Sequence, residues 1–194
     1  RVTKIQTEGS LVLYRGETAG VYPANQEMQE VSRVLVTDGL RFWVFVDVLR
    51  SLQPHIYTVI CNTDVQSRRD ELSAWYPLQG GDLRYQVFSD RPFQQKQYQQ
   101  HVSSVMTTQE QDKKCETDIQ TLATHSQEPE EEQIFFECFS FANEPVRVEY
   151  RERSLHLECG GCSYQMEVGY WDPAAGLTPI RVEKQDKILH TYSL

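Results

Sequence analysis

The stretch LHLECGGCSYQMEV, residues 155–168, constrains the fold of this chain more than any other segment. Apolar and polar residues alternate on both sides of Gly160-Gly161, and this period of two is typical of β-strands that bury one face. Two adjacent glycines supply the positive φ angles of a two-residue type I′ turn. We therefore predict a β-hairpin with its apolar residues on one face. The facing pairs are Cys159 with Cys162, Leu157 with Tyr164, and Leu155 with Met166.

The two cysteines of this hairpin, Cys159 and Cys162, allow several chemical interpretations. A thioredoxin-like pair begins a helix, whereas a strand pattern follows here. A zinc site needs four ligands, and the sequence holds no second Cys-x-x-Cys, so the pair is a weak candidate for a metal site. A disulfide across the turn would be strained. We favour two small thiols that pack as apolar groups at a hairpin tip.

A second hairpin is predicted in VSRVLVTDGLRFWVFVDV, residues 31–48, where Asp38-Gly39 separates two β-rich runs. A two-residue turn at this position sets Leu35 opposite Phe42. One face then carries Val31, Leu35, Phe42, Val44 and Val46, and the other carries Val34, Val36, Trp43 and Phe45. Because both faces are largely apolar, we expect a second sheet, a helix or a partner protein to cover each of them.

Short alternating runs predict the remaining elements. Strands are expected at 10–16, 55–61, 83–88, 134–142, 146–152, 178–184 and 187–192. Helices are expected at 63–76, which Pro77 ends, and at 91–108, which Asp90 caps. The segment 107–133 has few apolar anchors and ends in an acidic cluster, so we expect a polar, mobile loop or linker there.

These elements predict a mainly β fold, an antiparallel meander that forms a barrel or a strongly curved sheet, with one or two helices. The strand pattern is similar to that of calycin-like barrels, the lipocalin class of architecture, although the usual Gly-x-Trp of the first strand is missing. We expect one β-rich domain over residues 1–194. The alternative is a pair of β subdomains, 1–106 and 134–194.

Composition limits the partners and the compartment. A net charge of −9 disfavours nucleic acid as a partner, because phosphate binding needs a positive field. No run of about 18 apolar residues exists, so we expect no transmembrane segment. Five cysteines at irregular spacing and the absence of an Asn-x-Ser/Thr sequon favour a soluble protein of a reducing compartment. The chain begins with Arg1 and without a signal-peptide pattern, so we expect any targeting segment to be absent from it.

No catalytic constellation is visible: G-x-S-x-G, P-loop, H-E-x-x-H and G-x-G-x-x-G motifs are all missing, and we expect no cofactor. The leading hypothesis is a non-enzymatic module, an assembly, adaptor or scaffold factor, that binds another protein. The first alternative is a β-barrel carrier of a hydrophobic small molecule, with Val168 in its lining. The second is a zinc-stabilised interaction domain that uses Cys159 and Cys162. Candidate ligand or interface residues are Trp43, Phe45, Tyr164, Met166, Tyr170 and Trp171.

Overall fold

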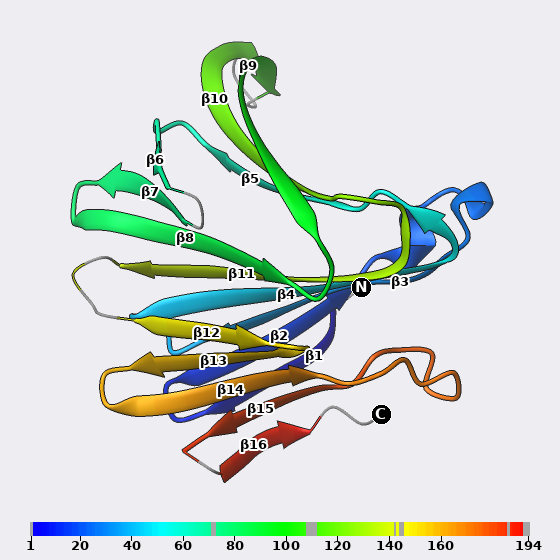
Figure 1. The fold of residues 1–194 in the computed structure, drawn as a ribbon. Helices are drawn as coiled ribbons and strands as arrows, with labels where there is room; N and C mark the ends of the chain where they lie inside the picture. Colours follow the sequence, from blue (N-terminus) through cyan, green and yellow to red (C-terminus); the bar gives the residue numbers. More distant parts are fainter. Residues whose placement is uncertain are drawn as a thin grey trace.

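The computed structural model describes residues 2–70, 73–107, 112–141, 143, 146–185 and 187–191, which form three open antiparallel sheets (Figure 1). Sheet A has the order β1 (Val2–Glu8), β2 (Leu11–Glu17), β3 (Met28–Thr37), β4 (Phe42–His55), β11 (Glu130–Phe141), β8 (Gly81–Ser89), β7 (Ser73–Leu78), β6 (Arg68–Arg69). Sheet B has the order β5 (Thr58–Thr63), β10 (Asp112–Ser126), β9 (Phe93–Thr107). Sheet C runs β12 (Arg147–Arg151), β13 (Ser154–Cys159), β14 (Cys162–Val168), β15 (Ile180–Lys184), β16 (Lys187–Thr191).

The prediction of a mainly β, antiparallel fold is confirmed, but the prediction that the strands close into a barrel is wrong. Each sheet of the described chain is open and ends in two edge strands. The sheets do not close on themselves; each buries its apolar face against another sheet. The helical content of the described residues is two 3₁₀ turns, η1 (Ala19–Val21) and η2 (Ala24–Gln26). In the same part of the chain, no helix is both long and apolar enough to cross a membrane.

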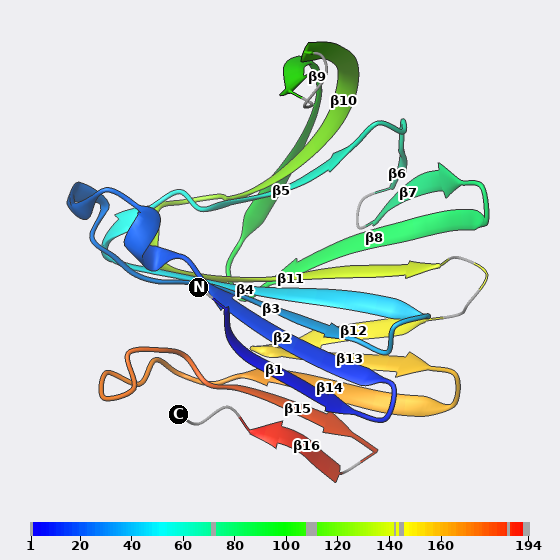
Figure 2. The same cartoon turned by 180° about the vertical axis from the view of Figure 1, so that it is seen from behind.

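Sheet A is the middle layer of the molecule, with sheet C on one side and sheet B on the other (Figures 1 and 2). The layer between sheets A and C is a continuous apolar core, in which Phe42 packs edge-on against Tyr164 with ring centroids 5.0 Å apart. A smaller cluster lies between sheets A and B and includes Tyr57, Tyr85 and Phe135. Both faces of the hairpin formed by β3 and β4 are therefore covered in part, as its two-sided apolar pattern predicts.

The hairpin at Asp38-Gly39 is confirmed, but its predicted register is wrong. Val36 faces Val44 and Leu35 faces Phe45, so Phe42, Val44 and Val46 share their face with Val34 and Val36. The cause is a longer loop. Asp38 Oδ1 accepts hydrogen bonds from the backbone N–H groups of Leu40 and Arg41, at 3.2 and 2.8 Å. The longer loop makes Thr37 face Trp43, which moves the register by three residues from the prediction.

The Cys159–Cys162 hairpin has the predicted register in all three facing pairs. Gly160 and Gly161 have φ angles of +55° and +75°, as a type I′ turn requires. A side chain at position 160 would also collide with the Arg41 guanidinium, which lies against the turn.

Both predicted helices are wrong. Residues 63–76 contain the end of β5, the short β6 and part of β7, and residues 93–107 form β9. The predicted loop at 107–133 is also wrong in its described part, since 112–126 is β10 and 130–133 begins β11. These segments are polar because much of their surface is exposed to water. They therefore lack the alternation of apolar and polar residues by which a strand is recognised in a sequence.

Strand β11 connects distant parts of the sequence. It lies between β4 and β8 in sheet A, where Glu137 faces Phe45 on one side and Val87 on the other. β11, which begins at Glu130, therefore lies between two strands, β4 and β8, that both end before residue 90.

Candidate functional site

A cleft of about 420 Å³ opens on the face of sheet A that is turned away from sheet C, beside β5. Its apolar lining includes Tyr14, Tyr22, Leu49 and Ile60. A neighbouring hollow of about 220 Å³ shares Tyr22 and Leu49 and adds Ile56. We call the two together the Tyr22 cleft. Tyr22, Ile56 and Ile60 are 43%, 50% and 49% exposed, so the rim presents apolar side chains to solvent.

The floor of the Tyr22 cleft carries an ionic network. The Arg33 guanidinium donates two parallel hydrogen bonds to Asp47, from Nε to Oδ1 and from Nη2 to Oδ2, each 2.7 Å long. Nη2 also donates to Glu137 Oε1 at 2.8 Å. The same guanidinium lies 5.2 Å from the ring centroid of Phe45. Three neighbouring strands, β3, β4 and β11, thus hold one planar cation in a fixed orientation.

Glu137 is the most perturbed acid of this network. Burial, followed by repulsion from Asp47, raises the pKa of Glu137 to about 8, against the opposing effects of Tyr85 and Arg33. The Tyr85 hydroxyl donates to Glu137 Oε2 at 2.6 Å. Burial and the same carboxylate raise the pKa of Tyr85 well above its ordinary value. Near neutral pH the network therefore holds a proton on its carboxyls, which offsets part of the cost of burying two acids.

The members of the network differ in their access to the cleft. The Arg33 side chain is 48% exposed, whereas those of Asp47 and Glu137 are 7% and 3% exposed. Tyr85 is 1% exposed. A ligand in the Tyr22 cleft would meet mainly the Arg33 guanidinium and the edge of Asp47, whereas Glu137 and Tyr85 are not part of the lining. The arrangement therefore presents a cation in a fixed orientation to a ligand in the cleft.

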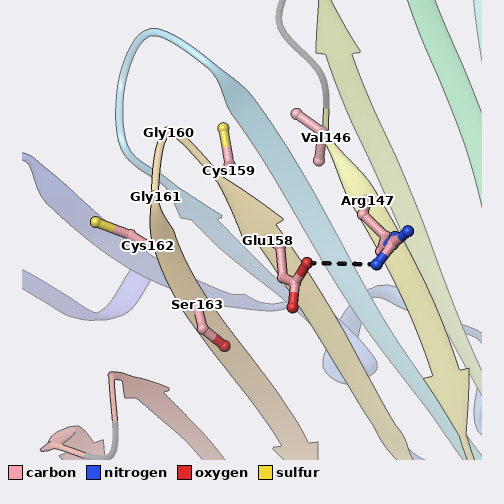
Figure 3. Close-up of a pocket in the computed structure, with 8 residues that line it drawn as sticks. All are labelled: Val146, Arg147, Glu158, Cys159, Gly160, Gly161, Cys162 and Ser163. Carbon is pink, nitrogen blue, oxygen red and sulfur yellow. Dashed lines mark ion pairs between the residues drawn. The ribbon is translucent and has the colours of Figure 1, made fainter.

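A larger hollow of about 790 Å³ lies at the tip of the Cys159–Cys162 hairpin (Figure 3). It is lined by hairpin backbone and by the pair Arg147–Glu158, whose charged atoms are 3.9 Å apart and whose side chains are 74% and 65% exposed. The sulfurs of Cys159 and Cys162 point in different directions (Figure 3). Because the charged side chains in the described lining of this hollow are exposed, we place the candidate site in the Tyr22 cleft, where the charged groups are held by buried partners.

The described residues contain no group of three or more His, Cys, Asp or Glu side chains that could hold a metal ion. Cys159 is buried in the core and Cys162 packs against it. The structure therefore offers the weak metal candidates Cys159 and Cys162 no further ligands from its described part. The side chain of Cys115 lies outside that part.

The predicted interface residues fall in three different places. Tyr164 and Met166, at 1% and 0% exposure, belong to the core between sheets A and C, together with Val168. They are covered by sheet A and are therefore inaccessible to a ligand. The fourth residue predicted to line a small-molecule cavity, Tyr170, is 80% exposed and lies apart from these three.

The four other candidates remain at least partly accessible. Phe45 lies under Arg33 at the candidate site, and Trp43 packs on the same face of β4, with its ring 5.7 Å from that of Phe141. Tyr170 and Trp171 follow β14, where their rings stack on the guanidinium groups of Arg153 and Arg50, at 4.9 and 5.4 Å.

Sequence reasoning missed Arg33, Asp47, Glu137 and Tyr85 as a group. Their separation explains this, since Arg33 and Glu137 are 104 positions apart. A signal was nevertheless present. Arg33, Asp47 and Glu137 each interrupt a strongly apolar strand, and a charge in such a position requires a partner.

An open antiparallel β-sandwich with a third, smaller sheet on its far side is thus the class of fold, and solved structures contain similar ones. No protein-family model and no curated protein matches the chain. The heparan sulfate lyase HepC of Pedobacter heparinus, in a mutant form, has a TM-score of 0.60 and 13% identity, over 87% of this chain and 27% of that one. A crystal structure of heparinase III has a TM-score of 0.57 and 12% identity, over 85% and 26%.

The heparinase III BT4657 gene product is also similar, with a TM-score of 0.57 and 11% identity, over 83% of this chain and 26% of that one. At such identities the likeness establishes the fold alone. The chain spans about a quarter of the length of these proteins.

Proposed function

We propose that this chain is a non-enzymatic protein-binding module, and that its Tyr22 cleft receives an apolar segment of a partner polypeptide. The observation that carries the proposal is the exposed apolar rim of Tyr22, Ile56 and Ile60 around a cleft that ends at Arg33. Apolar rims of this kind mark interaction surfaces on proteins. Aromatic residues and arginine are also the residues that most often dominate the energy of protein interfaces.

The floor of the cleft supports binding in a second way. Arg33 is already oriented by Asp47 and Glu137, so little conformational entropy is lost when a partner contacts it. Its donors are largely occupied by those carboxylates, so we expect a backbone carbonyl of the partner, and not a strong anion, to approach it.

The names of the similar structures raise the question of an acidic polysaccharide as ligand. The charge distribution of this chain disfavours an acidic polysaccharide as ligand. The chain carries a net charge of −9, and the cation that faces the cleft is paired with two acids. We therefore do not extend heparan sulfate binding to this chain.

The proposal can be tested with a library of random peptides of about 16 residues displayed on phage and selected on the immobilised protein. We expect enrichment of peptides with apolar and aromatic residues, which bind the wild type and lose at least tenfold in affinity for Ile60→Glu. The matched control is Ile5→Glu, which places the same charge on an isoleucine of β1 that is 64% exposed. Peptides that bind both variants as they bind the wild type, or a selection without enrichment, would contradict the proposal. Binding of heparan sulfate oligosaccharides that depends on Arg33 would replace it.

A further inference from the structure

The free edges of the three sheets differ in how they are protected against pairing with another strand. In the described chain, the edge strands are β1 and β6 in sheet A, β5 and β9 in sheet B, and β12 and β16 in sheet C. Natural proteins keep such edges short or place charges on them. β6 is two arginines, β12 has three charges in five residues, and β1, β5 and β16 have five to seven residues.

β9 is the exception, because it is a 15-residue edge with one formally charged residue, Lys96. Its sequence from Phe93 to Thr107 contains no proline. All fifteen residues pair with β10 on one side. The other side is the end of sheet B and leaves a row of backbone donors and acceptors available to a further strand.

The outer half of β9 also lacks support from the rest of the sheet. β5 pairs with β10 only between Gln120 and His125, so the ribbon of 100–107 with 112–119 has two strands. In both views this ribbon rises away from the three-layered body (Figures 1 and 2). A two-stranded ribbon is marginally stable in water, and an added strand would stabilise it.

The side chains of this edge are self-complementary. Gln97, Gln99 and Gln100 are exposed, and an amide side chain both donates and accepts hydrogen bonds. An identical strand that runs antiparallel about a two-fold axis at Gln100 would place Gln100 beside Gln100 and the other two glutamines beside polar residues, His101 and Ser103. It would also set each Lys96 opposite an uncharged residue of the second copy.

We propose that β9 pairs with β9 of a second copy of this chain, which joins the two B sheets into one six-stranded sheet. Assembly stops at two copies, because the pairing occupies the free edge of β9 in both of them. A single strand edge buries less than the roughly 1,200 Å² of a standard interface, so the dimer is weak and depends on concentration. Two bodies of charge −9 repel each other, and salt that screens this repulsion therefore strengthens the dimer.

Sedimentation equilibrium over a hundredfold range of concentration, at low and at high sodium chloride, tests the pairing. We expect a reversible shift from 22.6 kDa towards twice that mass, with a larger dimer fraction at high salt. Gln100→Lys brings two like charges together at the axis and should weaken the dimer at least tenfold. The matched control is Gln53→Lys, another exposed glutamine, which changes the net charge equally and should leave the dimer intact.

Three results would overturn the pairing. One is a single species of 22.6 kDa under all conditions. Another is growth beyond two copies. The third is a dimer that resists Gln100→Lys but dissociates in Ile60→Glu, since that would place the contact at the Tyr22 cleft. Circular dichroism and thermal unfolding of each variant establish that it is folded.

Discussion

Sheet A has two faces that hold their neighbours by different means, although the same strands form both. The face towards sheet C buries Phe42, Val44 and Phe136 in an apolar core. The opposite face buries Asp47 and Glu137 and satisfies them with Arg33 and Tyr85. The first face is mainly an apolar core, which also encloses the ion pair Arg15–Glu30, 2.7 Å apart. The second face combines a smaller apolar cluster with the network around Arg33. The two faces should therefore respond differently to truncation, to charge removal and to pH.

The largest effect is expected from a cavity in the apolar core. Phe136 is fully buried, and its ring lies 5.6 Å from that of Tyr150. Phe136→Ala should lower the free energy of unfolding by about 3–5 kcal/mol, because the surrounding core cannot fill the space. Urea unfolding at pH 6 and at pH 8 should give the same loss. A loss under about 1 kcal/mol, or one that depends strongly on pH, would contradict the description of this face.

Removal of the cation from the other face should have the next largest effect. Arg33→Met leaves Asp47 and Glu137 without their shared donor, and we expect a loss of about 2–3 kcal/mol at pH 8. This lies below the range for fully buried pairs because Arg33 is half exposed. Arg33→Lys keeps the charge but loses the parallel hydrogen bonds, so its free energy of unfolding should lie between those of the wild type and Arg33→Met. Wild-type stability in Arg33→Met at pH 8 would show that the network contributes little.

The pH dependence of this face follows from Glu137. Its folded pKa of about 8 lies above the ordinary value of 4.5, so the folded protein keeps a proton that the unfolded chain has released. Stability from this group is therefore full below pH 4.5 and is lost as the pH rises towards 8. The slope is at most about 1.4 kcal/mol per pH unit.

Glu137→Gln removes this titration and should flatten the curve of unfolding free energy against pH between 5 and 8. Glu158→Gln, at an exposed acid of β13, is the control and should leave the slope unchanged. Equal slopes in the wild type and in Glu137→Gln would show that the proton resides elsewhere.

The smallest effect is expected at the hairpin tip. The double variant Cys159→Ala, Cys162→Ala should remain folded and lose about 1 kcal/mol, because it removes two small packing groups. Addition of EDTA to the wild type should leave the Tm unchanged. Unfolding of the double variant, together with a fall in Tm on chelation, would establish zinc as a structural component of this hairpin.

Local turn chemistry determined how much of the fold was predictable. The register of the Gly160-Gly161 hairpin agrees with the prediction because two adjacent glycines favour a two-residue turn between the strands. At Asp38-Gly39 the same reasoning gave the wrong register, because the Asp38 side chain extends the loop. The sequence wrongly predicts a helix where β9 lies, since a Gln-rich ribbon exposed to water lacks the apolar period that separates strands from helices.

The candidate site was harder to predict than the fold. Single charges within apolar strands could have indicated that Arg33, Asp47 and Glu137 need partners. Which of them meet depends on β11 lying beside β4, a pairing between residues about 90 positions apart that no local pattern encodes. The sequence also gives no signal for the rim residue Tyr22, which lies between two 3₁₀ turns without periodicity.

The late position of β11 in the chain has a consequence for biosynthesis. While a ribosome makes this protein, β4 and β8 emerge first and must wait for the strand that lies between them. At about 5–20 residues per second, both edges stay unpaired for several seconds. The nascent chain is most prone to misassembly in that interval. A pause in translation before residue 130 would lengthen it, and a chaperone that masks the free edge of β4 would protect the chain until β11 arrives.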